Sequence, residues 1–321
     1  QTSLGTIQSP ASFMGVWSSG GNMTLARGTN RGAGDASAAL AFGGFRSGPY
    51  ARYSCVEEYN GLSWSAGTNL PTIQAEGGGD GTVNDAIVAG GYNNSFDTLT
   101  QEWNGSGWSA GGALPTGNAM ASLSGVSTAA VYIGGYQPSY TTATAEYNGS
   151  SWASGGTNPS CTWAPTAGGT QNSTIISGGS NPANPVGQTL TQTYDGTSFS
   201  TTNPNLSLNH LAGGGGNVND FTFNGGVPST STTQYYNGTT WNFACNSLNE
   251  RFYHFSNYSS GASGFNSGGR ISSTWVTSTE EVVKNNIPPY TTCVWTSGAG
   301  MINSRCALAG AGTQNASLGF G

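Results

Sequence analysis

Short apolar runs alternate with glycine-rich and polar stretches along this chain, at a length typical of strands rather than helices. Residues 38–42, for example, form the run Ala-Ala-Leu-Ala-Phe and end in a Gly-Gly pair. The pair recurs at spacings of 43 to 47 residues, as Gly43-Gly44, Gly90-Gly91, Gly134-Gly135, Gly178-Gly179, Gly225-Gly226 and Gly268-Gly269. Self-similarity at a fixed period indicates a repeat architecture.

A second feature recurs in step with the first: an aromatic residue, then Asn-Gly or Asp-Gly, then another aromatic. The instances are Tyr59-Asn60-Gly61 to Trp64, Trp103-Asn104-Gly105 to Trp108, Tyr147-Asn148-Gly149 to Trp152, Tyr194-Asp195-Gly196 to Phe199, and Tyr236-Asn237-Gly238 to Trp241. Asn-Gly between two such runs predicts a tight type I′ hairpin turn. Each unit therefore reads as four short strands, and the fold class is all-β.

The two ends of the chain resemble each other. Residues 16–43 match residues 294–321 without a gap, at an offset of 278 residues, or about six repeats. A ring in which the terminal strands pair would remove the exposed edges that a solenoid leaves. The sequence therefore predicts one domain, residues 1–321: a seven-bladed β-propeller with four-stranded blades, repeats of about 46 residues, and a closing blade shared by residues 1–20 and 300–321.

One aromatic residue opens the fourth strand of each predicted blade. We expect these residues to pack between neighbouring blades and to be structural, because large aromatic side chains dominate the packing of such cores. They are Trp17, Trp64, Trp108, Trp152, Phe199, Trp241 and Trp295.

An apolar strand ending in Gly-Gly, an aromatic before Asn or Asp, and a Trp about five positions later resemble the kelch repeat. The resemblance covers nearly the whole chain and is weakest in the sixth unit, where residues 282–286 replace the aromatic-Asn-Gly. The low-charge form, with Glu-Glu-Tyr-Asn-Gly-x-x-Trp, is similar to kelch-like repeats of marine and cyanobacterial phage virion structural proteins. This resemblance implies a propeller fold, whereas function must be argued from a site.

Charge narrows the possible partners. Charged residues make up 7% of the chain, the formal net charge is −6, and Lys284 is the single lysine. Without a basic stripe we expect no nucleic-acid binding. No apolar run approaches the ~18 residues that a membrane span needs, and the N-terminus lacks a signal-peptide pattern, so we expect no membrane insertion.

No catalytic or metal-binding motif stands out, and we expect no cofactor, no metal site and no enzymatic activity. A copper oxidase of the kelch type would need two histidine ligands, but His210 and His254 fall in different repeats. The acids cluster only as Glu57-Glu58 and Glu280-Glu281, and adjacent residues on a strand point to opposite faces. The five cysteines show no metal-ligand spacing.

The loops between the second and third strands of each unit are candidate binding elements, because there the repeat similarity lapses. Those of the first three units concentrate aromatic and arginine residues, which suit sugar stacking or protein contacts. Self-packing of these side chains is the structural alternative. The candidate binding residues are Phe45, Arg46, Tyr50, Arg52, Tyr53, Tyr92, Phe96, Tyr136 and Tyr140.

These observations favour a non-enzymatic surface protein of a virion, on a phage tail, a fibre or the capsid. Its expected partners are other virion or surface-assembly proteins, within a multimeric assembly, and host-surface glycans. Two alternatives stay open: a secreted or cell-surface propeller of cellular origin, acting as a lectin or assembly subunit, and a glycan-active enzyme.

Overall fold

The computed structural model describes residues 15–29, 31–46, 51–160, 162–260, 263–284, 309–313 and 316–320. The chain forms two compact units, Phe13–Asn286 and the combination of Gln1–Ser12 with Ile287–Gly321. In the second unit, β31 (Ala309–Thr313) and β32 (Ala316–Phe320) pair as an antiparallel hairpin. Among the described residues, no helix is long and apolar enough to cross a membrane.

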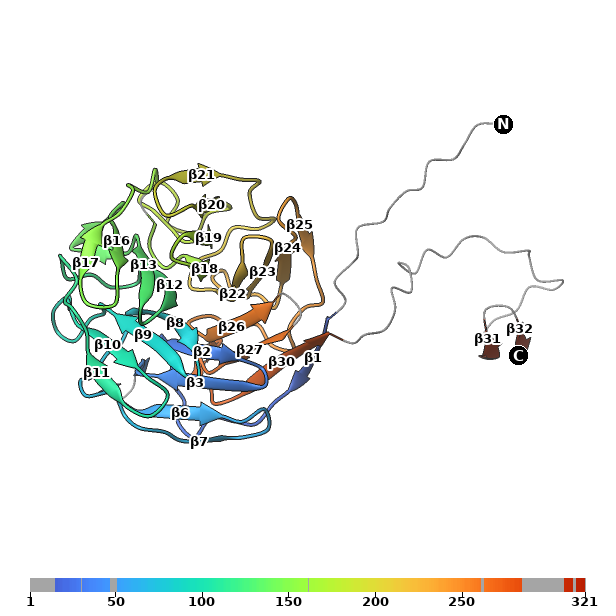
Figure 1. Cartoon of the computed structure of the whole chain (residues 1–321). Helices are drawn as coiled ribbons and strands as arrows, with labels where there is room; N and C mark the ends of the chain where they lie inside the picture. Colours follow the sequence, from blue (N-terminus) through green and yellow to red (C-terminus); the bar gives the residue numbers. More distant parts are fainter. Residues whose placement is uncertain are drawn as a thin grey trace, which may run out of the picture. The chain divides into compact units, whose positions relative to one another are not determined.

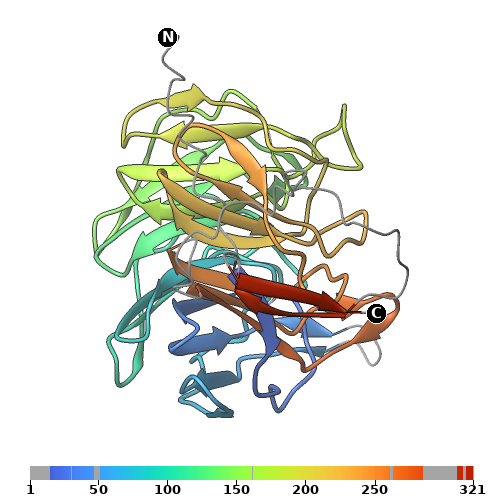
Figure 2. The same ribbon diagram turned by 90° about the vertical axis from the view of Figure 1, so that its right-hand side faces the viewer.

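The larger unit is a β-propeller of six four-stranded antiparallel blades (Figures 1 and 2). The strands of each blade are named from the innermost to the outermost. Blade 1 contains β2 (Arg31–Asp35), β3 (Ala38–Phe42), β6 (Val56–Tyr59) and β7 (Trp64–Ala66); blade 2 contains β8 (Gly78–Thr82), β9 (Asp85–Ala89), β10 (Thr100–Trp103) and β11 (Trp108–Ala110); blade 3 contains β12 (Ser122–Val126), β13 (Ala129–Ile133), β16 (Thr144–Tyr147) and β17 (Trp152–Ser154). Blade 4 contains β18 (Thr166–Thr170), β19 (Ser173–Ser177), β20 (Thr191–Tyr194) and β21 (Phe199–Thr201); blade 5 contains β22 (Gly213–Asn217), β23 (Asp220–Asn224), β24 (Thr233–Tyr236) and β25 (Trp241–Phe243); blade 6 contains β26 (Phe255–Ser260), β27 (Ser263–Ser267), β30 (Thr279–Lys284) and β1 (Gly15–Ser19).

The prediction of seven blades, with a closing blade formed by the two chain ends, is wrong. The N-terminal strand β1 pairs with β30, with Trp17 opposite Val282, and so becomes the outer strand of blade 6. The predicted partner segment instead contributes the hairpin β31–β32, which belongs to no four-stranded sheet.

The reason lies in the 278-residue offset. It equals about six repeats, and six repeats make one full turn of a six-bladed ring. Residues 294–320 therefore correspond to ring positions that residues 16–42 already occupy. Sequence similarity showed that the two ends align to the same positions of the repeat. It did not show which of the two ends pairs with the outer edge of β30.

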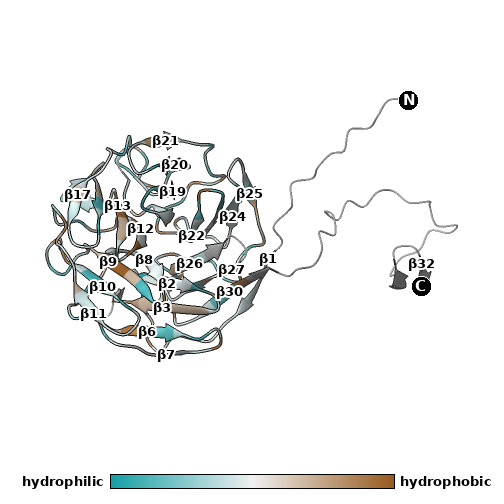
Figure 3. Ribbon diagram, in the orientation of Figure 1, coloured by the Kyte–Doolittle hydropathy of each residue, from teal (hydrophilic) through white to brown (hydrophobic). Residues whose placement is uncertain are grey.

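Local sequence explains the strand order within each blade. Glycine on an inner strand permits close approach: a Cβ on Gly32 would collide with the Phe255 ring of blade 6. The apolar second strands, such as β3 and β9, are buried and are drawn largely brown in Figure 3. The Asn-Gly turns are four-residue loops rather than the predicted type I′ turns, because the Asn60 side chain accepts the N–H groups of Leu62 (3.0 Å) and Ser63 (2.9 Å).

The aromatic residues that open the fourth strands reach toward the preceding blade. Trp64 Nε1 donates to Thr279 Oγ1 of blade 6, and Trp152 Nε1 donates to Thr100 Oγ1 of blade 2, each at 2.9 Å. The Trp17 indole of β1 donates to the carbonyl of Cys245, which follows blade 5 (2.9 Å). Trp108 and Trp241 likewise donate to backbone carbonyl groups in the segments that precede their blades. Phe199 packs against a hydrophobic cluster from blades 3 and 4. Trp295 lies outside the described residues.

Six residues, one from the segment that leads into each blade, form a closed circle of backbone hydrogen bonds at one end of the inner strands. We call this circle the axial ring. All six have φ between +50° and +62°, a region that residues other than glycine rarely adopt. The bonds run from Thr29 to Tyr253 (2.8 Å), Tyr253 to Leu211 (3.0 Å), Leu211 to Ala164 (3.3 Å), Ala164 to Met120 (2.8 Å), Met120 to Glu76 (2.6 Å) and Glu76 to Thr29 (3.4 Å), each from N–H to C=O. The axial ring holds the six blades in one fixed arrangement.

Candidate functional site

The loops between second and third strands begin directly after each Gly-Gly pair and are ordered by backbone pairing. Three of them are small hairpins: β4 (Phe45–Arg46) with β5 (Ala51–Arg52), β14 (Tyr136–Gln137) with β15 (Ser139–Tyr140), and β28 (Arg270–Ile271) with β29 (Thr274–Trp275). In blade 2, Tyr92 and Phe96 form an isolated bridge instead.

Further bridges tie these loops to the segments that lead into the axial ring. Phe45 pairs with Gly28, Tyr136 with Ala119, and Arg270 with Phe252. The loops and the axial ring therefore lie at the same end of the propeller, which we call the loop face. Because the loops are hydrogen-bonded at their bases, their side chains are displayed from a fixed backbone.

Aromatic and arginine side chains from blades 3, 2, 1 and 6 form one continuous series on the loop face, which we call the aromatic arc. Ring centroids lie 5.7 Å apart for Tyr136 and Tyr140, 5.8 Å for Phe96 and Tyr136, 5.3 Å for Tyr92 and Phe96, 6.0 Å for Phe45 and Trp275, 6.0 Å for Tyr253 and Trp275, and 5.3 Å for Phe252 and Tyr253. These separations are typical of favourable aromatic pairs.

Arginines join the segments of the arc. The Arg52 guanidinium carbon lies 5.0 Å from the Tyr92 ring centre and 5.7 Å from that of Phe45, so it connects blades 1 and 2. Arg270 lies 5.9 Å from the Phe252 ring and 5.8 Å from the Trp275 ring. Such cation–π contacts contribute roughly 0.5–1 kcal/mol at exposed sites and restrict the guanidinium to one orientation.

Every side chain of the arc is half-buried. One surface of each ring packs on its neighbours, while part remains accessible. Self-packing and partner binding are thus compatible in the arc: the internal contacts fix the rings, and their accessible parts form an aromatic surface with guanidinium groups at intervals. That combination suits the apolar faces and hydroxyl groups of a sugar, or the aromatic anchors of a protein interface.

Two acidic residues lie close enough to Arg52 for its charge to affect their pKa values. Burial raises the pKa of Glu76, and attraction to Arg52 and Arg31 partly opposes that rise. Burial also raises the pKa of Asp97, and Arg52 again opposes it. Arg52 therefore has two functions in the arc, as a cation stacked on aromatic rings and as the charge partner of half-buried carboxyl groups.

Most of the predicted binding residues fall in the arc, but some do not. Phe45, Arg52, Tyr92, Phe96, Tyr136 and Tyr140 belong to it. Arg46 and Tyr53 lie in the same blade 1 loop, half-buried and without a ring partner among the described contacts. Tyr50 lies outside the described residues.

Sequence reasoning missed the contribution of blade 6. Arg270 and Trp275 lie in the loop that follows Gly268-Gly269, at the place equivalent to Phe45 and Arg52 in blade 1. Phe252 and Tyr253 come from the segment that enters blade 6. The Gly-Gly spacing could have identified this loop, since the same rule located the loops of blades 1 to 3.

The arc stops at blades 4 and 5. The blade 4 loop contains an Asn181–Asn184 bridge and the 61%-exposed Val186, and the blade 5 loop follows Val227. Neither loop contains an aromatic residue. The two histidines also differ: His210 packs on Trp163, with ring centroids 5.5 Å apart, while His254 lies in the wall of an axial cavity.

Three of the paired acids identified in the sequence form ion pairs or hydrogen bonds within the fold. Glu57 forms an ion pair with Arg27, and Glu280 with Arg251 (2.6 Å), all four side chains being buried. Glu281 accepts a hydrogen bond from the Tyr59 hydroxyl, which joins blade 6 to blade 1. These carboxylates are therefore held in structural contacts.

The fold is that of a kelch-like β-propeller, and comparisons with known proteins agree with it. No protein-family model matches the chain, and no curated protein matches it. Among 243 solved chains that it resembles, YjhT superposes with a TM-score of 0.64, covering 80% of this chain and 95% of that chain, at 14% identity. A likeness at that identity shows the fold alone, so function must be argued from the site.

Proposed function

We propose that this chain is a non-enzymatic binding protein of an extracellular surface, and that the aromatic arc is its recognition site. The observation that carries the proposal is the continuity of the arc across four blades. All of these rings except Phe252 and Tyr253 lie in loops between second and third strands, where the repeat does not require them, and they remain partly accessible. A strand position would explain an aromatic residue by blade packing, whereas a loop position does not.

We propose a virion as the setting, with the protein on a phage tail, a fibre or the capsid surface. The low-charge form of the repeat and the single lysine support this setting, as does a chain rich in Ser, Thr, Asn and Gly. The partners of the arc would be another protein of the same assembly or a host-surface glycan. A cellular propeller acting as a lectin would use the same site, and the genomic neighbourhood of the coding sequence distinguishes the two settings.

A glycan array combined with a turnover assay tests the proposal. The full chain is applied to the array, and each glycan that binds is then incubated with the protein and analysed for cleavage or modification. We expect the chain to bind a subset of the glycans without turnover. If the partner is instead another protein of the assembly, affinity capture with the full chain should retain it.

Variants localise that binding. The double variant Arg52→Ala, Tyr92→Ala removes the junction between blades 1 and 2 of the arc, and we expect it to lose at least tenfold in affinity. Val186→Ala, on the blade 4 loop, is the matched control and should bind like the unaltered protein. Equal binding by both variants would remove the arc from consideration, and turnover of a bound glycan would show an enzyme.

A further inference from the structure

A cavity of about 670 Å³ lies on the propeller axis. It is lined by the inner strands of all six blades and by the turns that connect first and second strands. Its wall begins at residues that directly follow the axial ring, such as Ala121 and His254, and extends to exposed residues at the far end of the inner strands, such as Thr82 of β8 and Ser37 of the turn after β2. The cavity therefore lies on the other side of the axial ring from the aromatic arc and reaches solvent at the opposite face.

The size and lining of this cavity suit a small polar molecule. Ligand pockets in proteins typically enclose about 300–1,000 Å³. Glycine-rich inner strands leave the space open, and apolar side chains such as Leu123 and Val126 alternate with polar ones around the wall. An occupant could thus bury C–H surface and form hydrogen bonds at the same time.

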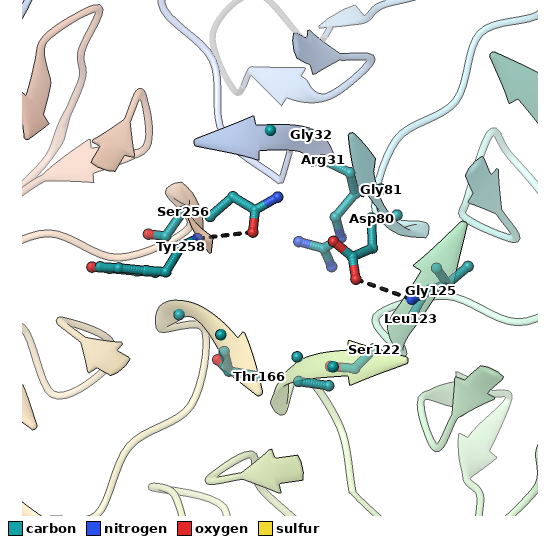
Figure 4. A pocket seen from close by; sticks show the side chains of 18 of the residues that line it. Arg31, Gly32, Asp80, Gly81, Ser122, Leu123, Gly125, Thr166, Ser256 and Tyr258 are labelled. Carbon is teal, nitrogen blue, oxygen red and sulfur yellow. Dashed lines mark hydrogen bonds between the residues drawn. The ribbon is translucent and has the colours of Figure 1, made fainter. Parts of the chain in front are cut away.

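Arg31 and Asp80 project into the cavity from neighbouring blades (Figure 4). Asp80 Oδ2 accepts the N–H of Gly125 at 3.1 Å. Burial raises the pKa of Asp80 to about 7, and hydrogen bonds from Gly81, Gly125 and the Asn257 side chain partly oppose that rise. The Arg31 Nε donates to the carbonyl of Gly77. Neither of the ion pairs found in the described part of the chain involves Arg31, so its terminal nitrogens retain donor capacity toward the cavity.

His254 supplies the second observation that points to an occupant. The side chain is only 3% exposed, and neither ring nitrogen has a hydrogen-bond partner among the described residues. Burial and the charge of Arg251 lower its pKa well below the ordinary value, so the imidazole is neutral, with one donor and one acceptor. A buried polar group without a partner costs about 1–3 kcal/mol, which a bound molecule or water would recover.

Ser256 lies beside His254 on the same wall, over Gly213, and a chain of side-chain hydrogen bonds orients it. Its Oγ donates to Asn266 Oδ1 (2.6 Å), and the Asn266 amide donates to Asn224 Oδ1 (2.6 Å). Because the hydroxyl hydrogen is engaged, the Ser256 oxygen presents lone pairs as an acceptor. The cavity thus contains fixed donors and fixed acceptors from three blades.

We propose that the axial cavity binds a neutral, hydroxyl-rich molecule of monosaccharide size, held by Arg31, Asp80 and the His254–Ser256 wall. Hydroxyl groups donate and accept, so they satisfy this mixed set, whereas an anion would face Asp80 and a cation would face Arg31. This site is separate from the aromatic arc and does not depend on its function.

Saturation-transfer NMR on the full chain tests the proposal with methyl glycosides of galactose, glucose, mannose and N-acetylglucosamine as probes. We expect at least one probe to bind, and we expect Asp80→Ala and Arg31→Met each to weaken it by about tenfold. Asp85→Asn is the matched control: Asp85 also accepts a backbone N–H, from Ser127 (2.8 Å), but it does not line the cavity. Circular dichroism checks folding, and Asp80→Asn replaces Asp80→Ala if the latter does not fold.

Three results would overturn the proposal: no binding by any probe, undiminished binding by both cavity variants, or loss of binding in Arg52→Ala, Tyr92→Ala. The last outcome would place the sugar on the arc and leave the proposed function intact. Loss of array binding in the arc variant with retained monosaccharide binding would instead support both sites independently.

Discussion

The loop face has two parts, formed by blades 6, 1, 2 and 3 and by blades 4 and 5. Their loops are anchored in the same way but carry different side chains. Blades 4 and 5 tie their loops to the axial ring through bridges between Trp163 and Ser180 and between His210 and Val227, as blades 1, 3 and 6 do through theirs. Yet the aromatic arc occupies blades 6, 1, 2 and 3 and stops there. The repeat therefore dictates where each loop begins and how it is anchored, but it does not dictate an aromatic residue at its tip.

Blades 1 and 6 also differ from blade 5 beneath the loops. The second residue of the third strand is Glu57 in blade 1 and Glu280 in blade 6, each in a buried ion pair. At the same position in blade 5, Gln234 donates to Ser207 Oγ (2.6 Å) instead. The blades that carry the arginines of the arc thus also contain buried charge pairs, and their stability should be more sensitive to loss of one partner.

The largest expected effect is on the free energy of unfolding, from a substitution at the second residue of the third strand. Glu57→Gln leaves the buried Arg27 guanidinium without its carboxylate and should lower the free energy of unfolding by about 3–5 kcal/mol. Gln234→Ala removes two neutral hydrogen bonds in blade 5, one donated to Ser207 and one accepted from Leu206, and should cost roughly 1–3 kcal/mol. Urea unfolding of both variants measures the difference, and equal losses would show that blades 1 and 5 do not differ in this way.

Next in size is the effect of the arc on binding. Arg52→Ala removes two cation–π contacts and should weaken binding of a partner by about 2 kcal/mol, while it lowers folding stability by only about 1 kcal/mol, the lower end of the sum of the two contacts. Titration calorimetry with a partner found on the array, beside thermal melting, separates the two quantities. A stability loss that matches the binding loss would mean that Arg52 acts through packing alone.

A smaller effect is expected from pH. Arg52 attracts Glu76 and Asp97, so Arg52→Ala should raise both pKa values further above their unfolded values. A carboxyl group whose pKa is higher in the folded state than in the unfolded state lowers the free energy of unfolding as the pH increases from its unfolded pKa to its folded pKa. The destabilisation by Arg52→Ala should therefore be greater at pH 7 than at pH 4, which urea unfolding at the two pH values would reveal. The same loss at both would contradict the assigned interaction.

The smallest effect on binding and stability is expected from a substitution in the blade 4 loop, outside the aromatic arc. Val186→Ala changes an exposed side chain in the blade 4 loop, and we expect binding and the free energy of unfolding to stay within about 0.5 kcal/mol of the unaltered protein. A substantial loss of binding in this variant would extend the recognition surface beyond the arc.

Much of the fold could be predicted from local patterns, because strand ends coincide with short-range signals. The Gly-Gly pair ends β3 at Phe42, and Trp64 opens β7, as the repeat indicates. Blade number depends on a long-range choice that such signals do not contain. The hairpins β2–β3 and β31–β32 have the same register at the 278-residue offset, yet only the first is part of a blade.

The candidate site was predictable in part for the same reason. Loops where the repeat lapses pointed to Phe45, Tyr92 and Tyr136, whereas the position of Arg52 between two blades depends on how those blades pack. Arg31 and Asp80 were not identified, because the sequence shows them as ordinary inner-strand positions. That they project into one cavity follows from the convergence of six strands on the axis.

Hydrogen–deuterium exchange on the full chain, with and without the strongest-binding glycan or captured partner, tests the recognition role of the arc most directly. The account predicts slower exchange in the loops that contain Phe45, Tyr92, Tyr136 and Trp275, with no change in the blade 4 and blade 5 loops around Val186 and Val227. Protection confined to the blade 4 and 5 loops, or to the opposite face, would contradict it.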